Sequence, residues 1–285
     1  GELRRRKLRV DKPFAVMMPD MDTVRRHCVV SPAEAELLTS RARPIVILAR
    51  RPKSTIAREI APGQDNIGVM LPYSPLHYLL LEPGPGFPEA LVMTSANLSE
   101  EPIAYTNDEA RERLLGLADA LLLHDREIHT RCDDSVMRIP PNEQERSLVM
   151  PLRRSRGYAP FPARLPWPVP PLLATGGELK NTFCIARDDY AFLSHHIGDM
   201  ENFETLASFE EGVAHMEHLF RVRPEIIACD MHPDYMASRY ARERADREGL
   251  TLVEVQHAHA HIAAGMAEHG LRGATPVIGV ACRGT

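Results

Sequence analysis

Three histidines lie close together in the segment VEVQHAHAHIAAGMAEH, residues 253–269. At about 100° per residue, His257 and His261 share one face of a helix, whereas His259 points to the opposite side. Two neutral imidazoles at this spacing can bind one divalent metal ion and leave positions for a carboxylate, a water or a substrate. The alternative is that one histidine packs in the core and the others are solvated, which is the commoner outcome for an isolated HxxxH pattern.

A second candidate site lies near the start of the chain, where Lys7, Arg9 and Lys12 precede an apolar run. Three cations spaced two and three residues apart can converge on a polyphosphate. Each of them would neutralise charge that builds on the leaving group in nucleotidyl transfer. The alternative is a basic run that is simply solvated.

A third group of polar residues, Thr94, Ser95 and Asn97, directly follows the predicted strand 90–93. Small hydroxyl and amide side chains at the end of a strand in an α/β fold are well placed to hold phosphate or carbonyl ligands. A polar turn that caps the next element would use the same residue types. The sequence leaves both interpretations open.

The elements that must position these residues in the first half are mostly short strands. We predict strands for the apolar runs 13–18, 43–49, 90–93, 120–124, 135–139 and 148–152. A helix should begin after Ser31, where SPAE supplies an N-cap serine, a proline at the first helical position and the capping-box residue Glu34. Residues 107–117 indicate an amphipathic helix, residues 52–75 a loop rich in Pro and Gly, and residues 76–81 a short helix or strand.

A proline-dense segment, residues 151–171, contains seven of the 24 prolines and the single tryptophan. Proline cannot donate a main-chain hydrogen bond to a sheet and favours extended backbone. We therefore predict a stiff connector at residues 156–171, which separates one domain at residues 1–155 from another at residues 172–285.

The predicted elements change in order after this connector. Strands are expected at 172–175, 182–186, 190–194, 225–230, 250–255 and 276–282, and helices at 203–220, at 234–248 and through the histidine segment. The second and third of these strands should pair as a hairpin about residues 187–189. Three strands followed by alternating helices and strands is the order of one lobe of an actin-like ATPase fold.

The turn GGELKN, residues 176–181, would join the first two strands of that lobe. In such a fold this turn approaches the nucleotide phosphates, because glycine lets main-chain N–H groups come close. Gly176, Gly177 and Lys180 are therefore candidate nucleotide-binding residues. An ordinary hairpin turn is the alternative.

Length and composition set the broad class of protein. With 285 residues, 44% of them hydrophobic and 26% charged, the chain can bury two cores. The net charge of -5 argues against a whole-surface nucleic-acid binder, although the basic runs 4–9 and 153–156 suit a phosphate-bearing ligand. No apolar run is long enough for a membrane span and no signal-peptide pattern opens the chain, so we expect a cytoplasmic protein without membrane or nucleic-acid partners.

The five cysteines are scattered and form no CxxC pair, which argues against both a disulfide framework and a cysteine zinc site. Three of them, Cys184, Cys229 and Cys282, lie in apolar runs, and we expect them to be buried and inert. The charged start of the chain, without a methionine, suggests that the sequence begins inside a longer protein.

Nine short segments, taken in order, resemble the HypF carbamoyltransferases of [NiFe]-hydrogenase maturation. They are KLRVDKPFAVM, IGVMLPYSPLH, MTSANLSEEPI, IHTRCDDSV, RRSRGYAP, GGELKNTFC, LSHHIGDMEN, CDMHPDY and VQHAHAHIAA. The resemblance implies an α/β fold: a YrdC-like twisted mixed sheet with helices, followed by a partial actin-like lobe of the Kae/TsaD type. It also implies that carbamate derived from carbamoyl phosphate is adenylated with ATP and that the carbamoyl group passes to the C-terminal cysteine of HypE.

The same resemblance implies roles for individual residues. Lys7, Arg9 and Lys12 match the KxRxxK element of YrdC-like domains and would bind ATP phosphates, with Mg²⁺ accompanying the nucleotide. Ser95 and Asn97 match the SxN element, which implies contacts to nucleotide or carbamoyl group. His257 and His261 match the HxxxH metal ligands of Kae/TsaD proteins, for zinc or iron. Asp230, His232 and Asp234 match a motif at a strand end, where we expect a supporting or substrate-side role.

Two departures from the family pattern temper these expectations. Cys282 and Arg283 stand where the family continues DGTGYG, and the third, acidic metal ligand would lie further downstream. We therefore expect weak metal binding and incomplete transfer by this chain alone. The alternatives are a threonylcarbamoyl-adenylate synthase and transferase that modifies tRNA, and a noncatalytic fragment that binds HypE or RNA.

Overall fold

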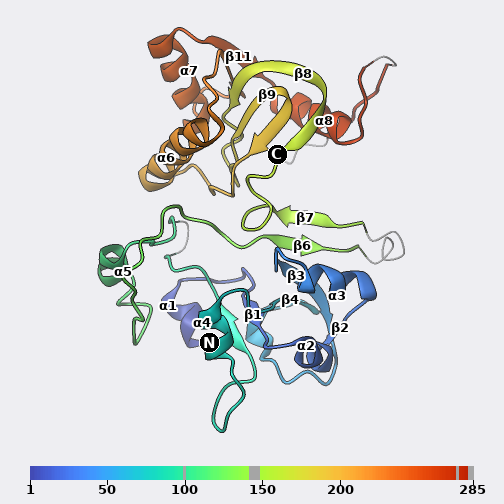
Figure 1. Cartoon of the computed structure of the whole chain (residues 1–285), viewed down its shortest axis with the longest axis vertical. Coiled ribbons are helices and arrows are strands. Elements are labelled where there is room, and N and C mark those ends of the chain that lie inside the picture. The colour runs from blue at the N-terminus through green and yellow to red at the C-terminus, as the bar shows by residue number, and fades with distance from the viewer. Residues whose placement is uncertain (99–100, 141–147, 274–275, 282–285) are drawn as a thin grey trace. The chain divides into compact units, whose positions relative to one another are not determined.

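A computed structural model of the chain describes residues 1–98, 101–140, 148–273 and 276–281 (Figure 1). The chain forms two compact units, one built from residues 1–98 and 103–158 and one built from residues 101–102 and from residue 159 onward. Each unit contains its own sheet and its own hydrophobic core, and each is described separately below. Both sheets are mixed and carry helices, which confirms the predicted α/β class.

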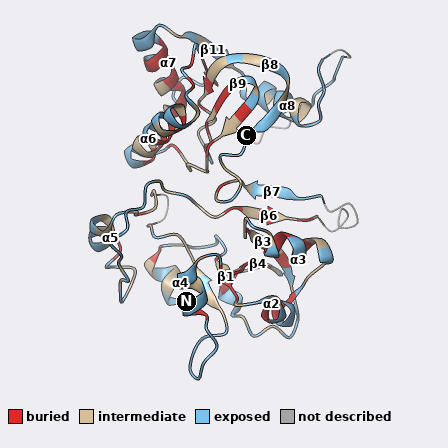
Figure 2. Cartoon of the chain, viewed as in Figure 1, coloured by how far each residue is buried: buried red, intermediate tan, exposed pale blue. Residues whose placement is uncertain are grey.

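The first unit is organised by a mixed seven-stranded sheet with the order β5-β1-β4-β3-β6-β7, in which β2 pairs with β3. Its strands are β1 (Ala15–Met17), β2 (Cys28–Val29), β3 (Ile45–Arg50), β4 (Asn66–Met70), β5 (Leu91–Met93), β6 (Val136–Arg138) and β7 (Met150–Arg153). The pairs β1–β4 and β3–β6 are parallel, and the other pairs are antiparallel. Side chains from the central strands, such as Val46, Leu48 and Val69, are fully buried in the core. Figure 2 colours parts of β3 and β4 as buried.

The first unit also contains short helices: α1 (Glu2–Arg6), α2 (Met21–His27), α3 (Pro32–Thr39), α4 (Pro75–Leu80), α5 (Asn107–Arg113) and the 3-10 helix η1 (Arg58–Ile60). The predicted capping box at the start of α3 is confirmed, since the Ser31 hydroxyl accepts from the Glu34 N–H and the Glu34 carboxylate accepts from the Ser31 N–H. A second capping box, formed by Thr106 and Glu109, begins α5.

Three predictions in this unit were wrong or incomplete. Strand β4 lies inside residues 52–75, where a loop was predicted, because its apolar run IGVM is flanked by Pro and Gly that dominate the local composition. Residues 120–124 form no strand, and Leu122 is 74% exposed. An apolar run becomes a strand only where a neighbouring strand offers main-chain partners. Helix α5 ends at Arg113, four residues earlier than predicted.

The second unit contains a four-stranded sheet with the order β11-β10-β8-β9. Its strands are β8 (Ala163–Ala174), β9 (Cys184–Leu193), β10 (Ile226–Asp230) and β11 (Thr251–Val255), and its helices are α6 (Phe203–Phe220), α7 (Met236–Glu248) and α8 (His257–Glu268). Strand β10 runs parallel to both β8 and β11, whereas β8 and β9 are antiparallel. Buried residues of α6 and α7 belong to the same core cluster as the sheet, and Phe183, Phe209 and Ile227 in this cluster are fully buried. Figure 2 colours parts of α6 and α7 as buried.

The connector predicted at residues 156–171 is wrong in its local structure, because residues 163–171 belong to strand β8. The ladder between β8 and β9 shifts register twice, between Arg164 and Val169 and between Val169 and Leu172. All four prolines of the strand, at positions 166, 168, 170 and 171, fall within these two shifts. Strand prolines are tolerated at such irregularities because no ladder hydrogen bond is required of them there.

Two further predictions in this unit were wrong. The expected hairpin about residues 187–189 is a single long strand, β9, in which Asp188 adopts a positive φ of 51°. Only two antiparallel strands therefore precede the alternating helices and strands. Residues 276–281 form no strand, and residue 282 of that prediction lies outside the described residues. None of the helices built from described residues combines the length and the apolar character needed to span a membrane.

Candidate functional sites

Lys7, Ser95 and Asn97 converge in the first unit, although almost ninety residues separate the lysine from the other two. The Lys7 ammonium donates to the Ser95 carbonyl at 2.6 Å and to Asn97 Oδ1 at 3.1 Å. The Ser95 hydroxyl donates to the same Asn97 oxygen at 2.7 Å. The strand pairing explains the convergence, because Ala15 of β1 lies opposite Met93 of β5. The segment before β1 therefore meets the segment after β5.

Burial makes Lys7 chemically unusual. The residue is 3% exposed, and desolvation, followed by repulsion from Arg9, lowers the pKa of its ammonium from 10.5 to about 8, against the opposing effect of Asp133. An ammonium group in such surroundings acts more strongly on a nearby anion than it would in water. The cluster is therefore suited to a phosphate or a developing negative charge.

Arg9 and Lys12 occupy the same loop but contribute differently. The Arg9 guanidinium donates to Thr94 Oγ1 at 3.4 Å and to the carbonyls of Lys12 and Pro13 at 3.0 and 2.6 Å. Lys12 contributes its carbonyl to these contacts, and its side chain is exposed. The structure thus brings Arg9 to Thr94, and the Lys12 carbonyl accepts hydrogen bonds from both Arg9 and Arg4.

Sequence reasoning missed Arg4, which braces this loop. Its guanidinium donates to the carbonyls of Arg9, Val10 and Lys12 at 2.9 to 3.1 Å and to the carbonyl of Glu59 at 2.8 Å. The residue belongs to the basic run 4–9, but its neighbours in that run have the same charge. The spacing of the run therefore does not distinguish Arg4 from the other basic residues. Its acceptors are main-chain carbonyls, which every residue type has, so the sequence contains no signal for these contacts.

The two histidines of the HxxxH pattern face each other at the start of α8 in the second unit. Nε2 of His261 lies 3.1 Å from Nε2 of His257, and Nδ1 of His257 lies 2.8 Å from Asp230 Oδ2. Asp230 ends strand β10 and is 7% exposed, whereas the His257 side chain is 46% exposed. Parallel pairing of Asp230 with Val255 brings the two strand ends together.

This geometry fits a divalent metal. Two nitrogen ligands of a tetrahedral zinc ion stand about 3.3 Å apart, close to the observed 3.1 Å. A carboxylate that accepts the Nδ1–H of a histidine directs the Nε2 lone pair outward, an arrangement common behind metal-binding histidines. Within the described residues, however, no group of three or more His, Cys, Asp or Glu side chains is placed to share an ion.

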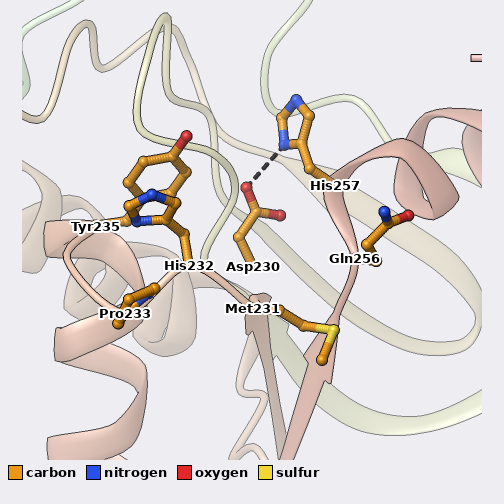
Figure 3. A pocket seen from close by; sticks show the side chains of 7 residues that line it. All are labelled: Asp230, Met231, His232, Pro233, Tyr235, Gln256 and His257. Carbon is orange, nitrogen blue, oxygen red and sulfur yellow. Dashed lines mark hydrogen bonds and ion pairs between the residues drawn. The ribbon is translucent and has the colours of Figure 1, made fainter. Parts of the chain in front are cut away.

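A cavity of about 220 Å³ lies beside Asp230 and His257 (Figure 3). Its walls are the loop after β10 and the junction of β11 with α8, namely Asp230, Met231, His232, Pro233, Tyr235, Gln256 and His257. The ring of His232 stacks on Tyr235 at 3.9 Å, and its Nδ1 accepts from the Asp234 N–H at 3.3 Å. His232 and Asp234 therefore belong to this loop, whereas the direct contact to His257 comes from Asp230.

The glycine turn lies against the histidine site. Gly176 has a positive φ of 78°, and a Cβ there would stand 2.2 Å from the Thr182 carbonyl oxygen. A Cβ on Gly177 would lie 3.4 Å from Cε1 of His257 and 3.8 Å from Asp230 Oδ2. The structure thus brings Gly177 to the site. The Lys180 side chain is exposed. The main-chain N–H of Lys180 donates to Asp199 Oδ1 at 2.6 Å.

The cysteines show how burial affects reactivity. Cys28 and Cys229 are buried, and burial raises the pKa of both thiols, that of Cys28 to about 12. Cys184 is only partly buried, contrary to the prediction for it, because β9 exposes part of that face. Cys282 lies outside the described residues, as does the departure at Arg283.

In comparisons with known proteins, two family models match the chain, one in each of its two compact units. A family model described as "HypF Kae1-like domain" matches residues 168–268, and one described as "Telomere recombination", for the Sua5, YciO and YrdC proteins, matches residues 1–154. The chain is 46% identical over its whole length to Carbamoyltransferase HypF2 of Cupriavidus necator, of which it covers 36%.

Two solved structures share the fold. The crystal structure of full-length HypF in the phosphate- and nucleotide-bound form matches 95% of this chain and 41% of that chain, with a TM-score of 0.87 and 47% identity. The crystal structure of T. kodakarensis HypF matches 95% of this chain and 35% of that chain, with a TM-score of 0.88 and 40% identity. The chain thus spans little more than a third of the length of the relatives that it matches.

Proposed function

Because the chain belongs to the HypF carbamoyltransferase family, we propose that it forms part of an ATP-dependent carbamoyltransferase. Residues 1–155 would adenylate carbamate derived from carbamoyl phosphate, and residues 172–285 would take part in passing the carbamoyl group to the C-terminal cysteine of HypE. The observation that supports the adenylating role best is the convergence of Lys7, Ser95 and Asn97.

Hydrolysis of carbamoyl phosphate by water gives carbamate and inorganic phosphate. Adenylation of that carbamate then exchanges one phosphorus–oxygen bond for another. A carbamate oxygen bonds to the α-phosphorus of ATP while the bond from that phosphorus to the bridging oxygen breaks, and pyrophosphate leaves. Negative charge therefore builds on the leaving group, and the buried Lys7 ammonium would stabilise it. Arg9 would add a second positive charge, and Lys12 would bind phosphates at the exposed rim.

The Ser95 carbonyl and the Asn97 amide oxygen would orient Lys7. These acceptors carry no formal charge, so they fix the ammonium without neutralising it. The Ser95 hydroxyl, already bonded to Asn97, would contact the nucleotide or carbamoyl group, with Mg²⁺ accompanying the ATP phosphates. The glycine turn would serve nucleotide phosphates in the second unit through Gly176, Gly177 and Lys180.

In the second unit His257 and His261 would hold a divalent metal, zinc or iron. A bound metal acts as a Lewis acid that polarises a carbonyl group, here that of the carbamoyl. Asp230 would keep the Nδ1 proton on His257 and thereby aim Nε2 at the metal. His232 would contact substrate from the wall of the cavity.

The test is release of pyrophosphate from ATP by the purified chain, with and without carbamoyl phosphate. We expect release that depends on carbamoyl phosphate. Threonine and bicarbonate, supplied instead, should not support it, and release with them alone would favour the tRNA-modifying alternative. Complete inactivity together with RNA retention in moderate salt would favour a noncatalytic fragment.

The transfer step needs its own assay. The chain would be incubated with ATP, carbamoyl phosphate and HypE. The mass of the C-terminal peptide of HypE would then be measured by mass spectrometry. Because transfer by this chain alone is expected to be incomplete, the proposal expects at most a small fraction of the terminal cysteine to carry the mass of one carbamoyl group. Pyrophosphate release without this modification would restrict the proposal to the first unit.

A further inference from the structure

Glu178 is a charged residue of the glycine turn that the proposed chemistry does not use. It follows Gly177 in the turn between β8 and β9, yet its carboxylate reaches α7, whose first residue is 58 positions further along the chain. Glu178 Oε1 accepts from the Met236 N–H at 3.2 Å. The second carboxylate oxygen is buried and has no hydrogen-bond partner within the described residues.

Helix α7 requires such an acceptor. The first N–H groups of a helix have no partner inside the helix, and the N-cap side chain usually accepts from one of them. The N-cap residue of α7 is Tyr235, which makes no side-chain capping bond. Glu178 therefore supplies from a distant turn the acceptor that the local sequence lacks, and its negative charge faces the positive end of the helix dipole.

The electrostatics of Glu178 reflect this position. Burial raises the pKa of its carboxyl group, and the N–H groups of Met236 and Ala237 oppose that rise. A carboxylate in such surroundings is held where its donors are, because any displacement would leave a charge both buried and unbonded.

Further hydrogen bonds hold the main chain of the glycine turn. The Glu178 carbonyl accepts from the Met200 N–H at 2.9 Å, and the Asn181 amide donates to the carbonyls of Thr175 and Gly177 at 2.9 and 2.6 Å. With α7 as the third attachment, the position of Gly177 is determined from several directions. Gly177 is also the residue that lies against His257 and Asp230.

We infer that Glu178 is a positioning residue, which ties the glycine turn to the start of α7 and so holds Gly177 against His257. The inference rests on the proposed function of the second unit, in which the glycine turn binds nucleotide phosphates and the two histidines bind a metal. The distance between these two sites would then depend on the Glu178 carboxylate. Loss of that carboxylate would let the turn move away from both His257 and the loop that follows Asp230.

Substitution of Glu178 separates this role from its alternatives. Glu178→Ala removes the acceptor, whereas Glu178→Gln keeps one oxygen that can accept the Met236 N–H. Glu201→Ala is the matched control, because Glu201 is a nearby exposed carboxylate whose charge raises the pKa of Glu178. All variants would be compared in the full chain, labelled with ¹⁵N on the main chain and in the histidine rings.

Two readouts test the contact itself. Amide exchange at Met236 should quicken about fivefold or more in Glu178→Ala and return toward the wild-type rate in Glu178→Gln. The ring ¹⁵N resonances of His257 should shift in the alanine variant and recover in the glutamine variant. A purely helix-capping role would change the first readout and leave the second as in wild type, which would overturn the inference. Unchanged exchange at Met236 would overturn it as well.

A third readout links the contact to ligands. Co²⁺ and Mg-ATP would be titrated separately, and Glu178→Ala should weaken binding of at least one of them about tenfold, with recovery in Glu178→Gln. If wild type binds neither probe, the proposed function of the second unit fails. The His257 resonances still decide the role of Glu178 in that case, so the two failures are distinguishable.

Discussion

The two candidate sites use opposite ways of bringing functional groups together. The Lys7 cluster joins segments 88 and 90 residues apart in sequence, and its central cation is buried. The histidine site begins with a local pair at i and i+4 on one helix, and both residues are exposed, the His257 side chain to 46%. A buried, long-range cluster depends on the packing of its unit, whereas a local pair depends on helix geometry. Mutations and pH should therefore affect the two sites differently.

The largest effect is expected from Lys7→Met. The change removes the buried ammonium while preserving most of the side-chain volume, and loss of one preorganised charge-stabilising donor typically lowers a rate by about 10²–10³. Pyrophosphate release at saturating ATP measures it. Lys53→Met, at an exposed lysine, is the control. A loss below threefold in Lys7→Met would show that the cluster is only structural.

The glycine turn offers the next largest effect, on stability. Gly176→Ala should lower the free energy of unfolding by at least about 2 kcal/mol, because a Cβ would clash with the Thr182 carbonyl oxygen and φ is positive. Gly177→Ala should cost less than about 1 kcal/mol, since its nearest contact is 3.4 Å. Urea unfolding of the two variants makes the comparison, and equal losses would contradict the local geometry.

Metal binding tests whether the second site depends on the facing pair of histidines. His257→Ala should weaken Co²⁺ binding by about 10- to 100-fold, because one of two facing nitrogens is lost. His259→Ala should leave binding unchanged, since that residue lies on another face of α8 and is exposed. Visible absorption during a Co²⁺ titration measures both. Equal effects would mean that the ion binds the exposed surface of the helix without using the facing pair.

The smallest expected effect is the pH dependence of the Lys7 cluster. Because the pKa of Lys7 is lowered to about 8, the ammonium loses its proton as the pH rises through that value. Affinity for Mg-ATP should fall by up to about tenfold between pH 7 and pH 9, and less if bound phosphate raises the pKa. Lys7→Met should show no such fall, and an identical pH profile in both proteins would exclude Lys7 as its cause.

Stability should respond to pH in the opposite direction. Between pH 8 and 10.5 the unfolded chain keeps the Lys7 proton that the folded chain has lost. The unfolded state then binds more protons, so this group makes the free energy of unfolding rise with pH. The difference between wild type and Lys7→Met in urea midpoints, measured across this range, isolates that contribution from other titrating groups.

Sequence patterns predicted the local features well. The capping box at Ser31 and Glu34, the facing pair His257 and His261, and the strands on either side of α7 each follow from residue types within a few positions. Patterns failed where neighbours in space decided the outcome. The run IGVM became β4 because β1 and β3 pair with it on either side. The prolines of β8 were accommodated because its partner strand shifts register.

The candidate sites divide in the same way. The sequence by itself determined which residue types were available: a lysine and arginine run, an SxN turn, a glycine turn and two histidines one helical turn apart. Only the tertiary structure decided that Arg4 braces the loop, that Asp230 holds His257 and that Glu178 reaches α7. These contacts join residues that strand pairing and helix packing bring together. The spacing of residue types along the chain does not determine which distant segments pair or pack, so it could not predict these contacts.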